Sequence, residues 1–200
     1  VIEGARYGAA VSWHPDGKSF FYNKLPKLQS GSADVGYINS LAYRHTLGKN
    51  PMKDVALFGR GVGGMNDLGE IDIPSIVVPA GARYALAAVR HGDARELEIY
   101  IAPADSLRHA LTPWKKIIER SDDVTDFQVR GADLYLLTHK NAPRYKVVRT
   151  DLMQPQFARA RVIVPESENV VSQIAIAADA LYFRQSSGGV DVLQRLNFST

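Results

Sequence analysis

Short apolar runs broken by turn-forming residues dominate the hydrophobic pattern of the chain. The runs are rich in Val, Ile, Leu, Tyr and Phe, and Gly, Pro, Asn or Asp bounds them, a pattern typical of β-strands. Strands that follow one another at short spacing predict an all-β chain. The predicted strands are Ser19–Asn23, Ile38–His45, Asp54–Phe58, Ser75–Val78, Tyr84–Arg90, Leu97–Ala102, Trp114–Arg120, Asp126–Val129, Asp133–Thr138, Tyr145–Asp151, Arg161–Val164, Ser172–Ala177, Ala180–Arg184 and Val190–Leu196.

The pattern also repeats. A strand, a tight turn and a second strand with an aromatic residue recur four times, over Val11–Tyr22, Ile76–Val89, Phe127–Thr138 and Ile174–Arg184. A third strand follows each hairpin, and a fourth follows the first three hairpins. A polar insertion over Leu25–Gly36 lengthens the first repeat.

Four antiparallel strands in every ~45–50 residues is the spacing of a β-propeller blade. A four-stranded sheet with two apolar faces buries both only by stacking on other sheets, and runs such as 134–137 and 174–177 suit strands covered on both sides. A β-sandwich, the rival architecture, predicts no such period. The predicted blades are approximately 1–62, 63–122, 123–168 and an incomplete 169–200.

Four blades are fewer than most propellers need for closure, so we expect the chain to be a fragment of a longer propeller. Such a fragment would leave an apolar blade face open at each end and unpaired strand edges in its last blade. Exposed apolar area of this kind promotes association, so self-association through the open faces is expected.

Composition narrows the function classes. The chain has 200 residues, 46% of them hydrophobic, and a net charge of +3 with both signs scattered. No basic stripe suggests nucleic-acid binding, and no apolar run approaches the ~18 residues that span a membrane. Cysteine is absent, which excludes disulfides and thiolate metal sites and leaves a soluble cytoplasmic and a soluble periplasmic location equally open.

No constellation of catalytic residues emerges from the sequence. No serine lies in a G-x-S-x-G elbow, because Gly17–Phe21 lacks the final glycine. The five histidines are dispersed and are interpreted as turn or surface residues, so no catalytic residue is predicted; they are His14, His45, His91, His109 and His139.

Other motifs also have ordinary structural interpretations. Gly59–Gly64 matches G-x-G-x-x-G, but no amphipathic helix follows it, which favours a connector between blades, and no cofactor is expected. Trp13 and Trp114 are expected to pack within blades. No metal site is predicted, because the acidic residues Asp122, Asp123, Asp126, Glu166 and Glu168 do not form an EF-hand loop.

Four segments together resemble the N-terminal β-propeller of the prolyl oligopeptidase (prolyl endopeptidase) family of serine peptidases. They are SWHPDGKSFFY at 12–22, YRHTLG at 43–48, NAPRYKVVRTDL at 141–152 and VIVPESENVV at 162–171. The resemblance implies a seven-bladed propeller joined to an α/β-hydrolase domain with a Ser-Asp-His triad. It further implies that the propeller covers the active site and admits short peptides, which are cleaved after proline. The parent would be an enzyme, whereas this chain alone would hydrolyse nothing.

The resemblance also suggests candidate site residues. In the family, loops on one propeller face look toward the hydrolase, and a few apolar propeller residues line outer subsites. Here Ile73, His91 and Asp93 are candidates for the rim of the substrate pocket, although the loop around Asp93 is shorter and more charged than is usual. Asn141, Arg144 and Ser187 are candidates for hydrolase-facing loops.

Two alternatives stay open at this stage. A stand-alone propeller-like module could present its loops to a partner or ligand, and the sequence beyond Thr200 would distinguish this module from a peptidase segment. A sister peptidase that prefers basic residues would look the same over this segment, because specificity is set mainly in the hydrolase half.

Overall fold

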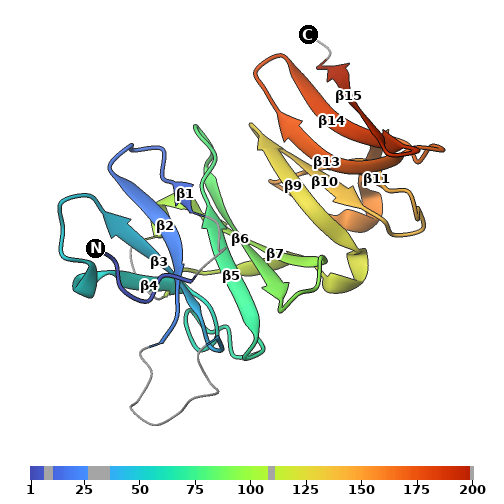
Figure 1. The fold of residues 1–200 in the computed structure, drawn as a ribbon. Helices are drawn as coiled ribbons and strands as arrows, with labels where there is room; N and C mark the ends of the chain where they lie inside the picture. The colour runs from blue at the N-terminus through green and yellow to red at the C-terminus, as the bar shows by residue number, and fades with distance from the viewer. Residues whose placement is uncertain (7–10, 27–36, 108–110, 199–200) are drawn as a thin grey trace. The chain divides into compact units, whose positions relative to one another are not determined.

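The computed structural model describes residues 1–6, 11–26, 37–107 and 111–198, and these residues form β-strands, turns and four 3₁₀ helices but no α-helix (Figure 1). The chain divides into two units, Val1–Lys116 and Ile117–Thr200, which are described separately. The all-β prediction is confirmed. Most of the predicted insertion, residues 27–36, and His109 lie outside the described residues.

The first unit contains two antiparallel sheets in which consecutive strands are neighbours, so that each sheet is a simple meander. The strands of the first sheet are β1 (Ser12–Trp13), β2 (Ser19–Lys24), β3 (Leu41–Thr46) and β4 (Val55–Phe58); those of the second are β5 (Asp72–Val77), β6 (Tyr84–His91), β7 (Leu97–Pro103) and β8 (Lys115–Ile118). The 3₁₀ helices η1 (Pro51–Lys53) and η2 (Ala104–Ser106) lie in the β3–β4 and β7–β8 connections.

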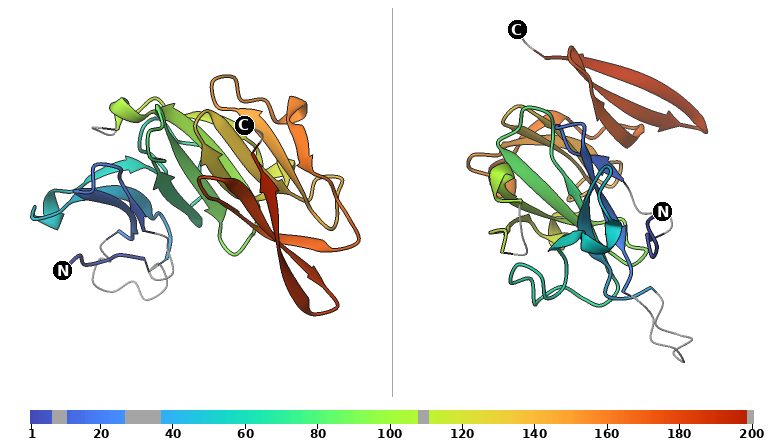
Figure 2. Two further views of the ribbon diagram at one scale, coloured as in Figure 1. Left: turned by 90° about the horizontal axis from the view of Figure 1, so that it is seen from above. Right: turned by 90° about the vertical axis from the view of Figure 1, so that its left-hand side faces the viewer.

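The second unit repeats the meander. Its four-stranded sheet contains β9 (Val124–Arg130), β10 (Asp133–Thr138), β11 (Lys146–Asp151) and β12 (Arg161–Val164); its three-stranded sheet contains β13 (Val170–Ile176), β14 (Ala180–Ser187) and β15 (Val190–Asn197). The 3₁₀ helices are η3 (Arg120–Asp122) and η4 (Phe157–Arg159). The twist of the three-stranded sheet is clear in the left view of Figure 2.

The β1–β2 turn shows why the sequence forms tight hairpins. Gly17 has a φ of +64°, a conformation that glycine adopts without strain. The Asp16 side chain accepts hydrogen bonds from the backbone N–H groups of Lys18, at 2.8 Å, and Ser19, at 3.0 Å. The aspartate therefore satisfies turn donors that the short hairpin leaves without backbone partners.

Aromatic packing joins the two sheets of the first unit. Phe58 of β4 lies with its ring centroid 5.1 Å from those of Tyr100 and Trp114. The indole Nε1 of Trp114 donates to the carbonyl oxygen of Leu57 at 3.0 Å, so the N–H group of this buried tryptophan has a hydrogen-bond partner. The prediction that Trp114 packs within the blades is confirmed by this burial.

A buried polar bridge complements this apolar contact. Asn23 of β2 is 3% exposed, and its Nδ2 donates to the carbonyl of Pro74 in β5 at 2.9 Å and to Ser40 Oγ at 3.1 Å. Ser40 Oγ in turn donates to the carbonyl of Asp72 at 3.3 Å. Because buried polar groups are costly when unpaired, these bonds favour one register of the first sheet on the second.

In the second unit, β10 is buried along most of its length. Leu134, Tyr135, Leu136 and Leu137 are all buried, as their apolar run predicts. Between the sheets, Asp126 of β9 accepts a hydrogen bond from the N–H of Ile174 in β13 at 3.3 Å. Burial raises the pKa of Asp126 above its ordinary value, although hydrogen bonds from the Ile174 and Phe127 N–H groups favour the carboxylate.

Two packing predictions are wrong. Trp13 is 57% exposed and makes an edge contact with Phe20, so it does not fill a blade interface. Ala175 and Ala177 of the 174–177 run are exposed, while Ile174 is buried. The reason is the same for Trp13 and Ala175: each lies on a sheet face that the described part of its own unit leaves uncovered, and Ala177 follows the end of β13.

We predict that Asn23→Ala destabilises the first unit by about 2 kcal/mol, because it removes two buried hydrogen bonds and leaves the Pro74 carbonyl unpaired. Both tryptophans of the chain lie in this unit, so urea denaturation followed by tryptophan fluorescence reports on it. Asn66 is exposed, and Asn66→Ala is the matched control. Equal stability of the two variants would contradict the role given to Asn23.

A second prediction concerns pH. Because the folded pKa of Asp126 is raised, the folded chain holds a proton that the unfolded chain has lost in the window above pH ~4. The stability that this group contributes is therefore present at low pH and is lost as the pH rises through the folded pKa. The loss is about 1.4 kcal/mol for each unit by which the folded pKa exceeds the unfolded pKa.

Asp126→Asn should flatten this fall, as measured by urea denaturation and circular dichroism between about pH 4 and pH 7. The exposed Asp67→Asn is the control. A profile of the Asp126 variant parallel to the unmodified chain would show that the pKa is not raised.

Candidate functional site

The candidate pocket-rim residues lie at one end of the sheet β5–β8. Ile73 is the second residue of β5 and is partly buried, and His91 is the last residue of β6. The register places His91 directly opposite Asp72, with Ile73 opposite Arg90. Asp93 lies in the turn beyond β6 and is exposed. The fold therefore places Ile73 and His91 at neighbouring register positions.

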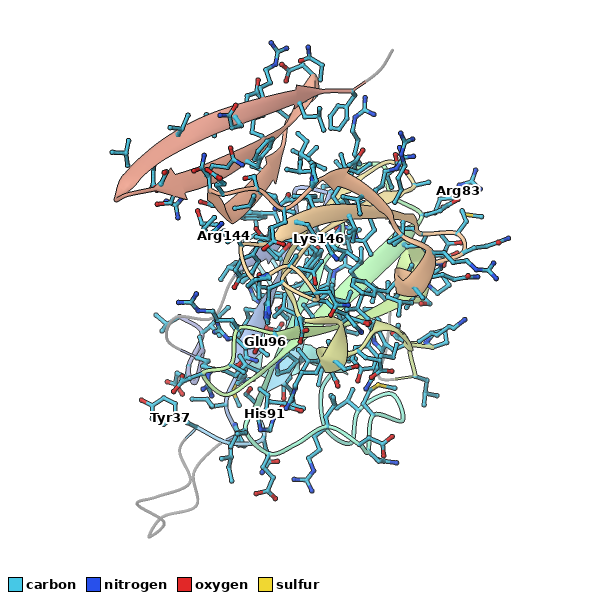
Figure 3. All side chains as sticks on the ribbon, turned by 90° about the vertical axis from the view of Figure 1, so that its right-hand side faces the viewer. Tyr37, Arg83, His91, Glu96, Arg144 and Lys146 are labelled. Carbon is cyan, nitrogen blue, oxygen red and sulfur yellow. The ribbon has the colours of Figure 1, made fainter. Side chains whose placement is uncertain are left out.

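His91 is held by a buried carboxylate. Its Nδ1 lies 2.6 Å from Oδ1 of Asp72, which is only 8% exposed. Asp72 Oδ2 accepts the N–H of Gly69 at 2.7 Å, so both carboxylate oxygens are occupied. An ionised carboxylate only accepts hydrogen bonds, so the contact fits a proton on Nδ1 that is directed at Asp72. The His91 side chain is 37% exposed (labelled in Figure 3).

Gly69 lies beside both side chains of this pair. A Cβ atom at position 69 would lie 3.5 Å from both Asp72 oxygens and from Cε1 of His91. The sequence reasoning identified His91 but missed Asp72 and Gly69. The available signal was an aspartate at the first position of one strand opposite a histidine at the last position of the next. This signal can be recognised only when the strand register is known.

A second histidine–carboxylate pair lies in the first sheet. His45 Nδ1 is 3.0 Å from each Asp54 oxygen, and Tyr22 donates its hydroxyl to Asp54 Oδ2 at 2.9 Å. Burial, followed by the hydrogen bond to Asp54 and its charge, raises the pKa of Tyr22 well above the usual range. His45 is 7% exposed, so this network stabilises the sheet rather than meeting a ligand.

The candidate loop residues of the second unit are exposed. Asn141 adopts a left-handed φ of +52°, and Ser187 ends β14. Arg144 is anchored through its backbone, since its N–H donates to Glu166 Oε1 at 2.7 Å and its carbonyl accepts the N–H of Val171 at 3.0 Å. The Arg144 side chain is thus presented from a fixed loop (labelled in Figure 3).

The Gly59–Gly64 motif takes the structural role that its sequence suggests. Gly59–Gly64 forms turns in which the N–H of Gly61 donates to Met65, and no helix follows before β5, so this segment is a connector. Within the described ranges, no group of three or more His, Cys, Asp or Glu residues could hold a metal ion. The same residues contain no helix of the length and apolarity needed to span a membrane.

Comparison with known proteins gives one consistent match. The family described as prolyl oligopeptidase, N-terminal beta-propeller domain, matches residues 1–200. Prolyl oligopeptidase A of Galerina marginata is 24% identical over 179 residues, which cover 83% of this chain and 22% of that protein. The chain thus spans about a fifth of the length of this curated relative.

Two solved structures show the same fold. A prolyl endopeptidase superposes with a TM-score of 0.79 at 22% identity, covering 98% of this chain and 27% of that one. Prolyl oligopeptidase B of Galerina marginata, bound to a 25-residue macrocyclization substrate, gives 0.82 at 18% identity, covering 98% and 26%. The propeller fold predicted from the repeat is confirmed.

Proposed function

The chain belongs to the prolyl oligopeptidase family, as part of its N-terminal β-propeller domain, and on this premise we propose that it is the non-catalytic propeller segment of a serine endopeptidase. In the parent enzyme it covers the active site of a hydrolase domain on the same chain and admits only short proline-containing peptides. The match of the family model to all 200 residues is the observation that carries the proposal.

The physical basis of the proposed gating is steric. Strands such as β6 and β10 are buried over most of their length, and a core of stacked sheets deforms little. A wall of this kind excludes a folded protein by size while a flexible peptide passes. The chain keeps folded proteins away from the active site. The hydrolase domain supplies the nucleophile, the base and the oxyanion donors.

The six candidate residues enter this proposal at the pocket rim and the hydrolase-facing loops. His91, held through Nδ1 by Asp72, presents Nε2 to a peptide, and Ile73 offers apolar surface beside it. Asp93 adds an exposed negative charge. Asn141, Arg144 and Ser187 are proposed to contact the hydrolase domain, with Arg144 suited to a carboxylate.

We predict that the purified 200-residue chain cleaves no proline-containing chromogenic peptide and is not labelled by a serine-directed phosphonate. An active serine peptidase of known structure serves as the positive control. Stoichiometric labelling of the chain would show that it carries its own activated serine, and the assignment as a non-catalytic segment would then fail.

The gating itself is tested in the full-length enzyme. Asn23→Ala loosens the contact between the first two sheets, so cleavage of a long unstructured peptide should rise relative to that of an octapeptide. Asn66→Ala is the control. An unchanged ratio in a measurably destabilised variant would contradict gating, and an enzyme that cleaves no proline-containing peptide would contradict the proposed substrate class.

We further propose that the isolated chain self-associates. β15 is an edge strand whose residues are all exposed, including Val190 at 65%, Val192 at 47% and Leu193 at 70%. An exposed apolar edge is a template for pairing with another copy. Light scattering should show a dimer or larger species at high micromolar concentration, and Leu193→Lys should shift it toward monomer. A monomer throughout would contradict this proposal.

A further inference from the structure

An open groove of about 650 Å³ lies within the first unit. The β3–β4 connection and strand β4 form one side of it, and Leu107, which follows η2, forms the other. The residues that line it are Arg44, Thr46, Gly48, Lys49, Asn50, Lys53, Asp54, Val55, Leu57 and Leu107. None of these is among the candidate rim or loop residues. A groove of this size accommodates several residues of a peptide, since small-molecule sites occupy roughly 300–1,000 Å³.

The apolar part of the groove comes from strand β4 and from Leu107, which follows η2. Leu57 of β4 is 1% exposed and Leu107 is 2% exposed, so their positions are fixed by the core beneath. Val55 is 45% exposed beside them and adds accessible apolar surface. The groove therefore offers an apolar partner a supported surface.

The charged part of the groove is positive. Lys49 and Lys53 are exposed and form no ion pair with a described residue. Asn50 orders the loop between them, because its side chain accepts the N–H of Met52 at 3.0 Å and its carbonyl accepts that of Lys53 at 3.0 Å. The two lysines are thus carried on an ordered connection.

The acidic group in the lining does not cancel this charge. Asp54 has a side chain only 5% exposed, and its oxygens are engaged by His45 and Tyr22. Arg44 pairs at 2.9 Å with Asp16, which is outside the lining. Lys49 and Lys53 are therefore the cationic groups of the lining that a ligand can meet. Because the net charge of the chain is only +3, an acidic ligand is attracted by these two lysines rather than by the chain as a whole.

We propose that this groove binds an acidic peptide segment in which carboxylates alternate with apolar side chains. The carboxylates pair with Lys49 and Lys53, and an apolar side chain lies against the exposed Val55, beside which the buried Leu57 and Leu107 fix the floor of the groove. The charge complementarity selects an acidic partner, and the apolar floor selects a peptide over a bare anion. This site is independent of the proposed peptidase function.

The test uses the 200-residue chain and a rhodamine-labelled probe of sequence Gly-Glu-Leu-Glu-Phe-Gly, followed by fluorescence anisotropy. The double variant Lys49→Gln/Lys53→Gln should bind about tenfold more weakly, and added salt should weaken binding to the unmodified chain. Arg120 and Arg159 are exposed in the second unit, so Arg120→Gln/Arg159→Gln removes the same charge elsewhere and should bind normally.

Two further probes separate the contributions of charge and apolar contact. A peptide with glutamine in place of glutamate, and one with serine in place of leucine and phenylalanine, should each bind more weakly than the parent probe. The proposal is overturned if the lysine variant binds as well as the unmodified chain, if both double variants lose affinity equally, or if the glutamine peptide binds as well as the acidic one.

Discussion

Covering the apolar faces of the sheets is the constraint on which the rest of the structure depends. An antiparallel meander made of runs such as Leu134–Leu137 exposes apolar surface on two sides and is stable only when a neighbouring sheet covers it. In the first unit this contact is made by Phe58, Tyr100 and Trp114 and is aligned by Asn23. Stacking of successive sheets follows from the pattern of the strands themselves.

The same stacking positions the polar features at the strand ends. Asp72 is buried because β5 lies against the first sheet, where Ser40 binds its carbonyl, and the buried carboxylate then fixes His91. The β3–β4 connection, which carries Lys49 and Lys53, lies beside Leu57 and Leu107, and the core holds these two leucines in place. A rigid sheet stack with chemistry on its connections is the arrangement expected of a scaffold whose loops meet partners.

The sequence was sufficient for the strands, the repeat and the fold class, because short apolar runs bounded by glycine and aspartate turns are a local signal. Strand register and face coverage are not local. Trp13 and Ala175 are exposed because their sheet faces lack a neighbour in their own unit, which no local pattern encodes. Asp72 and Gly69 were missed because their role depends on the pairing of Asp72 with His91 across two strands.

Residue-resolved hydrogen exchange tests the stacking account most directly. Amides of β6 and β10, which are buried along most of their length, should exchange slowest, and those of the exposed edge strand β15 should exchange fastest. Under native conditions the account predicts that β6 exchanges slowest in the first unit and that β10 exchanges more slowly than β15 in the second. Exchange from β15 as slow as that from β10 would contradict it, because protection would then not follow the covering of sheet faces.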